Sequence, residues 1–358
     1  MVTVTAFSGK TAAVMGLGIA GLAAARALAD GGARVLAWDD APAARDRARA
    51  AGITPTDLSR PGALDDAQAL VLSPGIPHTH PAPHAVVKAA ADAGVPLTGE
   101  VALLALTCPQ ARYIGITGTN GKSTTTALIA HILHKAGLRA HAGGNLGEPA
   151  LALPPLGADG LYVLEMSSYQ LELSAPRFHG AILLNITPDH LARHGGMDGY
   201  RRAKARLFEA QQAGDIAVIG IDDPDSRALA DRLEQQERRV IRVSGTTTVP
   251  GGVGTGDGML IDDRTGERET VCRLVEAPHL PGVHNAQNIA AAAALLLEIG
   301  IDPTAIRAGL ADFPGLPHRQ EQVASIGDVA FVNDSKATNA QAAARALACY
   351  RRIYWIAG

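Results

Sequence analysis

The sequence predicts an α/β fold in which helices pack closely on parallel sheets. Strand-like and helix-like runs alternate along much of the chain, and twice a glycine-rich turn joins a strand to a helix. The composition agrees, because 47% of the residues are hydrophobic, only 4% are aromatic and 39 are glycine. Small residues let a helix approach a sheet closely. A length of 358 residues predicts two domains and part of a third.

Charge and cysteine content exclude several classes of protein. The 32 basic and 35 acidic residues give a formal net charge of −3, which offers no global positive field to nucleic acid or anionic lipid. Cys108, Cys272 and Cys349 have no paired spacing, which argues against a disulfide framework and a structural zinc site. The longest apolar run, residues 289–297, is about half of a bilayer span, and no signal segment opens the chain. These features predict a cytoplasmic protein with no nucleic-acid partner and no membrane insertion.

The N-terminal third of the sequence has a βαβ rhythm. It runs through a strand at 11–14, a helix at 22–29 and strands at 35–38 and 69–72, the last followed by a Ser-Pro-Gly turn. The rhythm is lost after residue 102, so a domain boundary is expected near residue 105. Residues 1–104 are therefore predicted to form a Rossmann-like domain.

The central part begins a new parallel sheet. Its predicted elements are a strand at 113–116, a helix at 123–136, strands at 161–164 and 181–185, and a helix at 281–293. Glycine- and threonine-rich residues 242–273 read as hairpins and predict a peripheral β insertion. We expect a central domain at 105–314.

The last segment reads as the start of a third domain. Residues 313–319 form a turn with proline and glycine, which predicts a boundary near residue 315, and a strand is expected at 329–332. The sequence closes on an apolar, strand-like run at 353–357. Residues 315–358 are expected to be the beginning of an incomplete Rossmann-like domain, so that the chain is a C-terminally truncated form.

The first glycine-rich turn carries Gly16, Gly18 and Gly21 between a strand and a helix. These glycines allow a tight turn, and the free N–H groups of the helix N-terminus can bind phosphate. Asp39 ends the next strand, where a ribose-binding acid belongs. The pattern alone suggests NAD, but it supports any nucleotide diphosphate. A tight turn without a ligand is the alternative interpretation.

The second glycine-rich turn is Gly-Thr-Asn-Gly-Lys-Ser-Thr at 118–124. It also lies between a strand and a helix, where backbone N–H groups cradle phosphates, Lys122 reaches the β and γ oxygens and a hydroxyl holds Mg²⁺. A standard Walker motif would place its first glycine where Ile116 stands, so the pattern fails at one position. An ordinary glycine-rich turn is the alternative.

This second turn resembles the phosphate loop of the Mur ligase and folylpolyglutamate synthase superfamily. These ATP-dependent enzymes join an amino acid to a carboxylate through an acyl phosphate. Further motifs resemble the family of UDP-N-acetylmuramoyl-L-alanine:D-glutamate ligases, in the same order along essentially the whole chain. They lie at 144–147, 165–171, 187–194, 200–204, 284–288, 315–319 and 333–339.

The resemblance implies two groups of ATP-binding residues. The loop is expected to contribute Gly118, Thr119, Asn120, Gly121, Lys122, Ser123 and Thr124. The other expected contacts are Asn285, Asn288, Arg319 and Asp334. Asn285 and Asn288, one helical turn apart, would face the same way, although Asn285 could instead be a helix N-cap.

The resemblance also implies two Mg²⁺ ions. Ser123 and Glu165 are expected to hold the first, and His190 the second, near the substrate carboxylate. Lys204 is expected to be carbamylated by CO₂, which turns a cation into an anionic oxygen ligand. Lys122, Glu165, His190 and Lys204 are thus the expected catalytic residues.

Composition alone gives two of these residues plainer roles. Glu165 could be a solvated carboxylate at a strand end, and Lys204 lies in a basic helix, 200–208, that looks like an ordinary solvated face.

Residues from both domains are expected to bind the UDP-linked substrate. They are Gly18, Ile19, Ala20, Asp39, Ser73, Pro74, Gly75, Asn145, Ser167 and Gln170. Two departures from the family pattern stand out. Ala192 replaces a common aspartate, and Asp40 and Ala41 replace a Thr-Arg pair that can pair with phosphate. Lys336 and Thr338 resemble substrate-side residues.

The resemblance implies a two-step ligation in peptidoglycan precursor synthesis. ATP phosphorylates the carboxylate of UDP-N-acetylmuramoyl-L-alanine, and the amine of D-glutamate then displaces phosphate. The full-length enzyme is expected to be monomeric. The 358-residue chain, which is expected to lack most of the third domain, is not expected to be fully active. The alternatives are a folylpolyglutamate synthase-like ligase, a non-catalytic nucleotide-binding fragment and an NAD-dependent oxidoreductase, the last supported only by residues 16–39.

Overall fold

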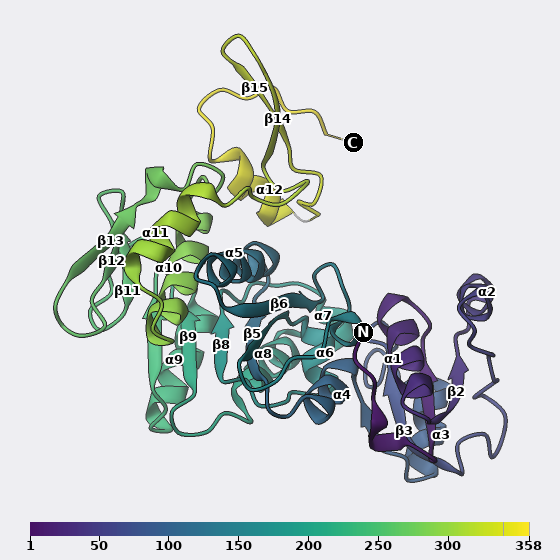
Figure 1. Cartoon of the computed structure of the whole chain (residues 1–358). Helices are drawn as coiled ribbons and strands as arrows, with labels where there is room; N and C mark the ends of the chain where they lie inside the picture. The colour runs from purple at the N-terminus through teal and green to yellow at the C-terminus, as the bar shows by residue number, and fades with distance from the viewer. Residues whose placement is uncertain (339, 358) are drawn as a thin grey trace. The chain divides into compact units, whose positions relative to one another are not determined.

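A computed structural model describes residues 1–338 and 340–357 (Figure 1). Asn339, the last residue of the motif at 333–339, and Gly358 lie outside the described residues. The chain divides into two compact units that exchange segments along the sequence. The first unit contains Met1–Thr117, Arg139–Ala181 and Pro188–Asp215, and the second contains Gly118–Leu138, Ile182–Thr187 and the described residues from Ile216 onward. The domain boundaries expected near residues 105 and 315 stay predictions.

The first unit begins with a parallel four-stranded sheet in the order β2-β1-β3-β4. Its strands are β1 (Thr11–Met15), β2 (Arg34–Trp38), β3 (Ala67–Leu72) and β4 (Leu97–Thr98). Its helices are η1 (Thr5–Phe7), α1 (Ile19–Asp30), α2 (Pro42–Ala50), α3 (Ala85–Asp92) and α4 (Glu100–Thr107). The predicted strands at 11–14, 35–38 and 69–72 and the helix at 22–29 are confirmed.

The core of this sheet is aliphatic. Met15, Leu70 and Leu72 from the strands pack with Val86 and Ala90 of α3, and each side chain is nearly or fully buried. Since β1 is buried along its whole length, its end is held rigidly where the first glycine-rich turn begins.

Three further strands of the first unit run parallel in the order β5-β7-β6. They are β5 (Arg112–Thr117), β6 (Arg139–Gly144) and β7 (Gly160–Glu165). Ile116 and Gly144 both pair with Glu165, so the carboxyl ends of the three strands are level. The short helices of this part are η2 (Ala150–Ala152), α6 (Ser168–Leu173), α7 (Leu191–His194), α8 (Met197–Ala205) and η3 (Arg206–Phe208).

The second unit carries strands in the order β13-β12-β11-β10-β9-β8. They are β8 (Gly180–Leu183, which begins in the first unit), β9 (Ile216–Gly220), β10 (Val240–Val243), β11 (Val253–Gly256), β12 (Met259–Asp262) and β13 (Glu269–Arg273). The pairs β11–β12 and β12–β13 are antiparallel, which confirms the predicted hairpins within 242–273. The predicted strand at 181–185 ends early, at Leu183.

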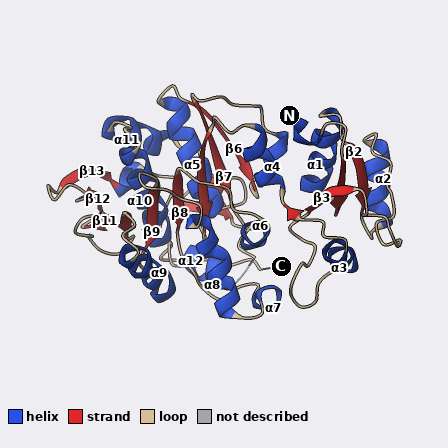
Figure 2. Ribbon diagram, turned by 90° about the horizontal axis from the view of Figure 1, so that it is seen from below, coloured by secondary structure: helices blue, strands red, loops and turns tan. Residues whose placement is uncertain are grey.

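Helices of the second unit cover these strands. They are α5 (Lys122–Lys135), α9 (Pro224–Gln235), η4 (Leu274–Glu276), α10 (Val283–Glu298) and α11 (Pro303–Asp312). Helix α10 packs on β9, β10 and β11 and contacts both α5 and α11 (Figure 2). It is apolar on nearly every side and is buried from Asn285 to Leu296, as expected of a helix enclosed by other elements.

The last described segment is small. An antiparallel hairpin of β14 (Glu321–Ile326) and β15 (Val329–Asn333) precedes α12 (Ala340–Leu347). The predicted strand at 329–332 is confirmed, but the one at 353–357 is wrong. Tyr354 and Ile356 are each 95% exposed, and no described strand lies beside them to complete a hydrogen-bonded ladder. Among the described residues, no helix combines the length and apolarity that crossing a bilayer requires.

Candidate active site

The phosphate loop starts directly after β5 and ends in the first turn of α5. Gly121 caps α5 with a φ of +89°, and a Cβ atom there would lie 2.3 Å from Oδ1 of Asn288. Only glycine fits this left-handed position against α10. The loop backbone can therefore approach α10 closely and present the N–H groups of the helix N-terminus to an anion.

Two residues after β8 hold the loop in place. The backbone carbonyl oxygen of Asn185 accepts a hydrogen bond from the N–H of Thr119 at 2.9 Å. Its side-chain Oδ1 accepts one from the N–H of Asn120, also at 2.9 Å. The Oγ1 of Thr119 donates to the carbonyl oxygen of Thr187 at 3.0 Å and accepts from its N–H at the same distance. This explains why β8 ends at Leu183: the following backbone binds the loop instead of a neighbouring strand.

Two cationic side chains of the second unit meet at this loop. Lys122 Nζ donates to the carbonyl oxygens of Gly118 and Thr119, each at 2.9 Å, and Arg319 Nη2 donates to Ser123 Oγ at 3.0 Å. Ser123 is buried, and Thr124 is half-buried in the first turn of α5. The structure thus brings Arg319 to the loop across 196 positions of sequence.

The turn that carries Arg319 is fixed by its neighbour Gln320. The N–H of Gln320 donates to Asp334 Oδ1 at 3.0 Å, and its side-chain nitrogen lies 3.0 Å from Nε2 of His284. Burial, together with Arg345, lowers the pKa of His284 to about 4, so the ring is neutral near pH 7 and can accept this hydrogen bond. Burial also raises the pKa of Asp334, although the bond from Gln320 and the charge of Arg319 oppose the shift.

Asn285 and Asn288 face the same way on α10, as predicted. Asn288 Nδ2 donates to Asn285 Oδ1 at 3.0 Å, and Asn285 Nδ2 donates to the carbonyl oxygen of Pro281 at 2.8 Å. Both side chains are buried. The alternative that Asn285 is an N-cap is wrong, because Gly282 occupies the cap and Asn285 lies within the helix.

In the first unit, Glu165 ends β7 beside Asn145. Asn145 Nδ2 donates to Glu165 Oε1 at 2.7 Å, while the buried Oε2 has no hydrogen-bond partner among the described residues. Glu165 is only 2% exposed, so the alternative of a solvated strand end is wrong. A Cβ atom on Gly144 would lie 2.6 Å from the carbonyl oxygen of Glu165, which explains the glycine before Asn145. A buried carboxylate oxygen of this kind suits a hard cation.

Ser167 and Gln170 form the capping box of α6. Ser167 Oγ accepts from the N–H of Gln170 at 3.2 Å, and Gln170 Oε1 accepts from the N–H of Ser167 at 2.9 Å. The side-chain nitrogen of Gln170 points to Oε1 of the buried Glu100, at 3.4 Å. The contact of Ser167 and Gln170 with the UDP-linked substrate stays a prediction.

His190 and Lys204 lie in the same unit but in different environments. His190 is the N-cap of α7, with a φ of +52°, and its side chain is 52% exposed. Lys204 is 1% exposed, with Nζ 4.6 Å from the centroid of the Tyr200 ring. The interpretation of 200–208 as a solvated basic face is therefore wrong for Lys204. Its face of α8 also carries Tyr200 and Ala203 and turns inward.

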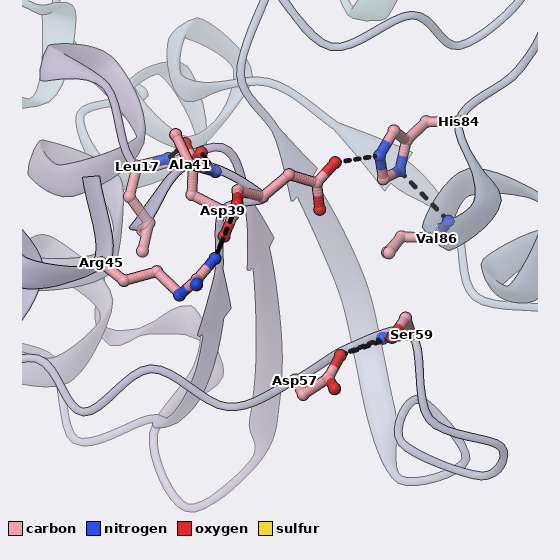
Figure 3. Close-up of polar contacts among 9 residues, drawn as sticks. Leu17, Asp39, Ala41, Arg45, Asp57, Ser59, His84 and Val86 are labelled. Atoms are coloured by element: carbon pink, nitrogen blue, oxygen red, sulfur yellow. Dashed lines mark hydrogen bonds and ion pairs between the residues drawn. The ribbon is translucent and has the colours of Figure 1, made fainter. Parts of the chain in front are cut away.

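The N-terminal turn is organised by Asp39 (Figure 3). Asp39 Oδ2 accepts from the N–H of Leu17 at 2.7 Å and Oδ1 from that of Ala41 at 2.8 Å. Ser73 Oγ donates to the carbonyl oxygen of Gly16 at 2.8 Å, which joins the ends of β1 and β3. The other N-terminal residues predicted to bind the UDP-linked substrate lie around this turn. Gly18, which is the N-cap of α1, Ile19 and Gly75 are exposed, whereas Ala20 and Pro74 are half-buried.

Two residues beside Asp39 were not predicted as site residues. Arg45 Nη1 donates to the carbonyl oxygens of Asp39 and Asp40, each at 2.7 Å, and its guanidinium lies 4.5 Å from the Trp38 ring centroid. His84 caps α3 and lies 2.8 Å from Asp40 Oδ2 (Figure 3). The position of Arg45 in the first turn of α2, the helix after β2, could have indicated that it lies near Asp39. No local sequence pattern indicates that His84 pairs with Asp40.

The remaining candidates form no compact constellation. Lys336 and Thr338 are exposed in a turn after β15. Among residues 1–338 and 340–357, no three His, Cys, Asp or Glu side chains are grouped so that they could hold a metal ion.

Comparisons with known proteins identify the family that the chain resembles. Residues 116–296 match the Mur ligase middle domain. The chain is 52% identical to a UDP-N-acetylmuramoylalanine–D-glutamate ligase of Rhodospirillum rubrum, covering 98% of this chain and 75% of that protein. It is 50% identical to the protein of the same name from Paramagnetospirillum magneticum, covering 100% and 78%. A crystal structure of UDP-N-acetylmuramate:L-alanyl-gamma-D-glutamyl-meso-diaminopimelate ligase from Neisseria meningitides shares the fold, with a TM-score of 0.60, 18% identity, and coverage of 86% and 99%.

The fold and the phosphate loop define a nucleotide-dependent α/β enzyme with a second glycine-rich turn between β1 and α1. The identities of about half over essentially the whole chain make the assignment specific. The chain belongs to the Mur ligase family, in the group of the UDP-N-acetylmuramoylalanine–D-glutamate ligases.

Proposed function

We propose that the chain is the ATP-dependent ligase that adds D-glutamate to UDP-N-acetylmuramoyl-L-alanine, forming ADP and phosphate in peptidoglycan precursor synthesis. The observation that carries this proposal is the phosphate loop braced by Asn185 and met by Lys122 and Arg319, in a chain about half identical to enzymes of this name. NAD-dependent oxidoreduction leaves that loop without a role.

The chain's own residues support a two-step reaction. The N–H groups of the loop and α5 bind the phosphates of ATP, and Lys122 and Arg319 offset the charge on the transferred γ-phosphoryl group. The substrate carboxylate becomes an acyl phosphate, and the amine of D-glutamate attacks its carbonyl carbon and displaces phosphate. Asn285, Asn288 and Asp334 are proposed to hold the adenosine part of ATP.

Two Mg²⁺ ions complete the proposed site. Glu165 and Ser123 are proposed to contribute oxygens to the first, and the unpartnered buried oxygen of Glu165 supports this. His190 and a carbamate on Lys204 are proposed to contribute to the second. When bound, the ions neutralise phosphate charge as it develops in the transition state.

The organisation of the chain follows the same proposal. Residues 1–104 bind the UDP-linked substrate, 105–314 bind ATP, and 315–358 begin a domain for the amino acid. The nucleotide substrates favour a cytoplasmic location, and we propose that the full-length form acts there as a monomer.

A direct assay tests the function. The chain is incubated with Mg²⁺, ATP and UDP-N-acetylmuramoyl-L-alanine, with and without D-glutamate, and products are measured by mass spectrometry and phosphate release. Product heavier by one glutamyl residue, with one phosphate released for each, is expected of the full-length form, whereas residues 1–358 alone are expected to bind UDP-N-acetylmuramoyl-L-alanine and to form little of this product. The proposal would be contradicted if ATP turnover did not depend on UDP-N-acetylmuramoyl-L-alanine or D-glutamate. It would also be contradicted if the chain added glutamate to a folate and not to UDP-N-acetylmuramoyl-L-alanine.

Asp39 gives a sharper prediction for the UDP site. Asp39→Ala removes two charge-assisted hydrogen bonds that hold the N-terminal turn, so affinity for UDP-N-acetylmuramoyl-L-alanine is expected to fall about 10-fold or more. Isothermal titration calorimetry measures it, and ATP affinity should stay unchanged. Asp57→Ala is the matched control, because Asp57 makes its bonds to Ser59 in the same domain (Figure 3). If Asp39→Ala and Asp57→Ala bound UDP-N-acetylmuramoyl-L-alanine with equal affinity, Asp39 would not belong to the binding site.

A further inference from the structure

A row of neighbouring aromatic side chains runs from His190 to Lys204 within the first unit, with the rings of Tyr169 and His194 stacked and the other ring pairs tilted. The ring centroids of His190 and Tyr169 are 5.2 Å apart, those of Tyr169 and His194 are 5.4 Å apart, and those of His194 and Tyr200 are 5.3 Å apart. Lys204 Nζ then lies 4.6 Å from the Tyr200 centroid. Separations of this size are typical of attractive contacts between rings, or between a cation and a ring. We call Tyr169, His194 and Tyr200 the aromatic stack.

His194, the middle of the aromatic stack, is held at both ring nitrogens. Its Nδ1 lies 2.8 Å from Glu172 Oε1 and its Nε2 lies 2.9 Å from Ser168 Oγ, and its side chain is 0% exposed. Ser168 and Glu172 are four residues apart on α6, so both face the ring. Glu172 Oε1 can accept a proton from Nδ1, and Nε2 lies within hydrogen-bond distance of the Ser168 hydroxyl.

The charge state of Glu172 fits this arrangement. Burial alone would raise the pKa of Glu172, but the hydrogen bond from His194 and the nearby His78 and Arg193 outweigh it and lower the pKa. The carboxylate is therefore ionised near neutral pH and orients the imidazole plane.

The backbone around His194 forms a tight, glycine-rich connection between two short helices. Helix α7 is four residues long and is followed by Gly195 and Gly196, both with positive φ. A Cβ atom on Gly199 would lie 1.8 Å from the carbonyl oxygen of His194, so α8 starts directly against this residue. The path from His190 to Lys204 thus depends on the side-chain packing of His194.

We propose that the aromatic stack is a positioning network, which fixes His190 relative to Lys204 and so sets the affinity of the second metal site. This inference rests on the proposed function, because that function supplies the metal and the carbamate on Lys204. Tyr169, His194 and Tyr200 are not among the residues proposed to bind the nucleotide or the metal ions. They act through His190 and Lys204.

The test measures metal at Lys204 in the whole chain without relying on turnover. The protein is equilibrated with ¹³C-bicarbonate, the carbamate resonance is recorded by NMR, and Mn²⁺ is added in place of Mg²⁺ until paramagnetic broadening removes the signal. Lys204→Arg, which should show no such resonance, assigns it. In the unsubstituted chain, the Mn²⁺ concentration for half-broadening gives the reference affinity.

The variants at Tyr169 separate the ring from the rest of the side chain. Tyr169 is only half-buried, so both variants should fold. Tyr169→Phe keeps the ring and should stay within about twofold of the reference, whereas Tyr169→Leu should need about 10-fold more Mn²⁺, as when a residue that orients a metal ligand is lost. His194→Ala should need about 10-fold to 100-fold more.

A control and two contrary outcomes complete the test. His131→Ala is the matched control, because His131 of the second unit also has a carboxylate partner, Asp312, and an aromatic neighbour, Phe313. It should match the reference. Unchanged Mn²⁺ dependence in both Tyr169→Leu and His194→Ala would overturn the positioning role alone. Absence of a carbamate resonance in the unsubstituted chain would overturn the proposed metal ligand at Lys204 and, with it, this inference.

Discussion

Replacing Lys122 with alanine is expected to reduce ATP turnover by about 100-fold to 1,000-fold while leaving the fold intact. The loss is of the size caused by removing one preorganised group that stabilises transition-state charge. Lys122 lies at the first position of α5, and its Nζ reaches back to the loop carbonyl oxygens of Gly118 and Thr119. In the proposed function, a cation held at this position faces the phosphates of ATP.

The same contacts show why the variant should fold. The hydrogen bonds from Lys122 to the loop carbonyls are worth about 1 kcal/mol each, and Lys122 is not part of the apolar core. Thermal unfolding should therefore shift by a few degrees at most. Lys135→Ala, at the other end of α5, is the control, because its partner Asp312 lies away from the loop. If folded Lys122→Ala and Lys135→Ala turned over ATP at the same rate, the phosphate loop would have no role in the reaction.

Local patterns predict the elements that carry the proposed nucleotide sites. The strand, glycine turn and helix around residues 112–135 are contiguous, so their residue types alone indicate the loop. Asn285 and Asn288 are three residues apart, and helical geometry then places them together, as their hydrogen bond confirms. The hairpins within 242–273 follow from short alternating runs separated by glycine.

Long-range features could not be read in this way. Arg319 and Ser123 are 196 positions apart, and only the folded chain joins them. A strand forms only beside a partner, so the apolar composition of residues 353–357 could not decide their structure. The expected contacts of these residues with substrates stay predictions.

The environment of Lys204 was misjudged for a different reason. Charge composition indicated a solvated helix, yet Tyr200, Ala203 and Lys204 are spaced as the buried face of a helix and are buried together. The informative signal is the position of Lys204 on the apolar face defined by the helical repeat, and not the number of basic residues nearby.

Glu100→Gln is expected to stabilise the protein above pH 7 and to leave it nearly unchanged at pH 4.5. Glu100 begins α4, is 4% exposed, and its Oε2 has no hydrogen-bond partner among the described residues. Burial raises its pKa to about 7, while the Ala150 N–H and the Gln170 amide oppose the shift only in part. The folded chain therefore holds this proton more tightly than the unfolded chain, in which the pKa is near 4.5.

The sign of the pH dependence follows from this difference. The stability contributed by protonated Glu100 is fully present below about pH 4.5 and is lost as the pH rises through about 7. A shift of this size corresponds to about 3 kcal/mol of unfolding free energy. Glutamine mimics the protonated form at every pH, so the variant should keep most of that free energy at pH 8.

Urea unfolding of the two proteins at pH 4.5, 6 and 8 measures the effect. The difference in unfolding free energy should be near zero at pH 4.5 and grow to about 2–3 kcal/mol in favour of Glu100→Gln at pH 8. Glu267→Gln is the control, because Glu267 is exposed and should not change the pH dependence. Parallel pH profiles for the unsubstituted protein and Glu100→Gln would show that Glu100 is already ionised in the folded chain. The buried contact between Glu100 and Gln170 would then be a charged one, beneath the cap that carries Ser167.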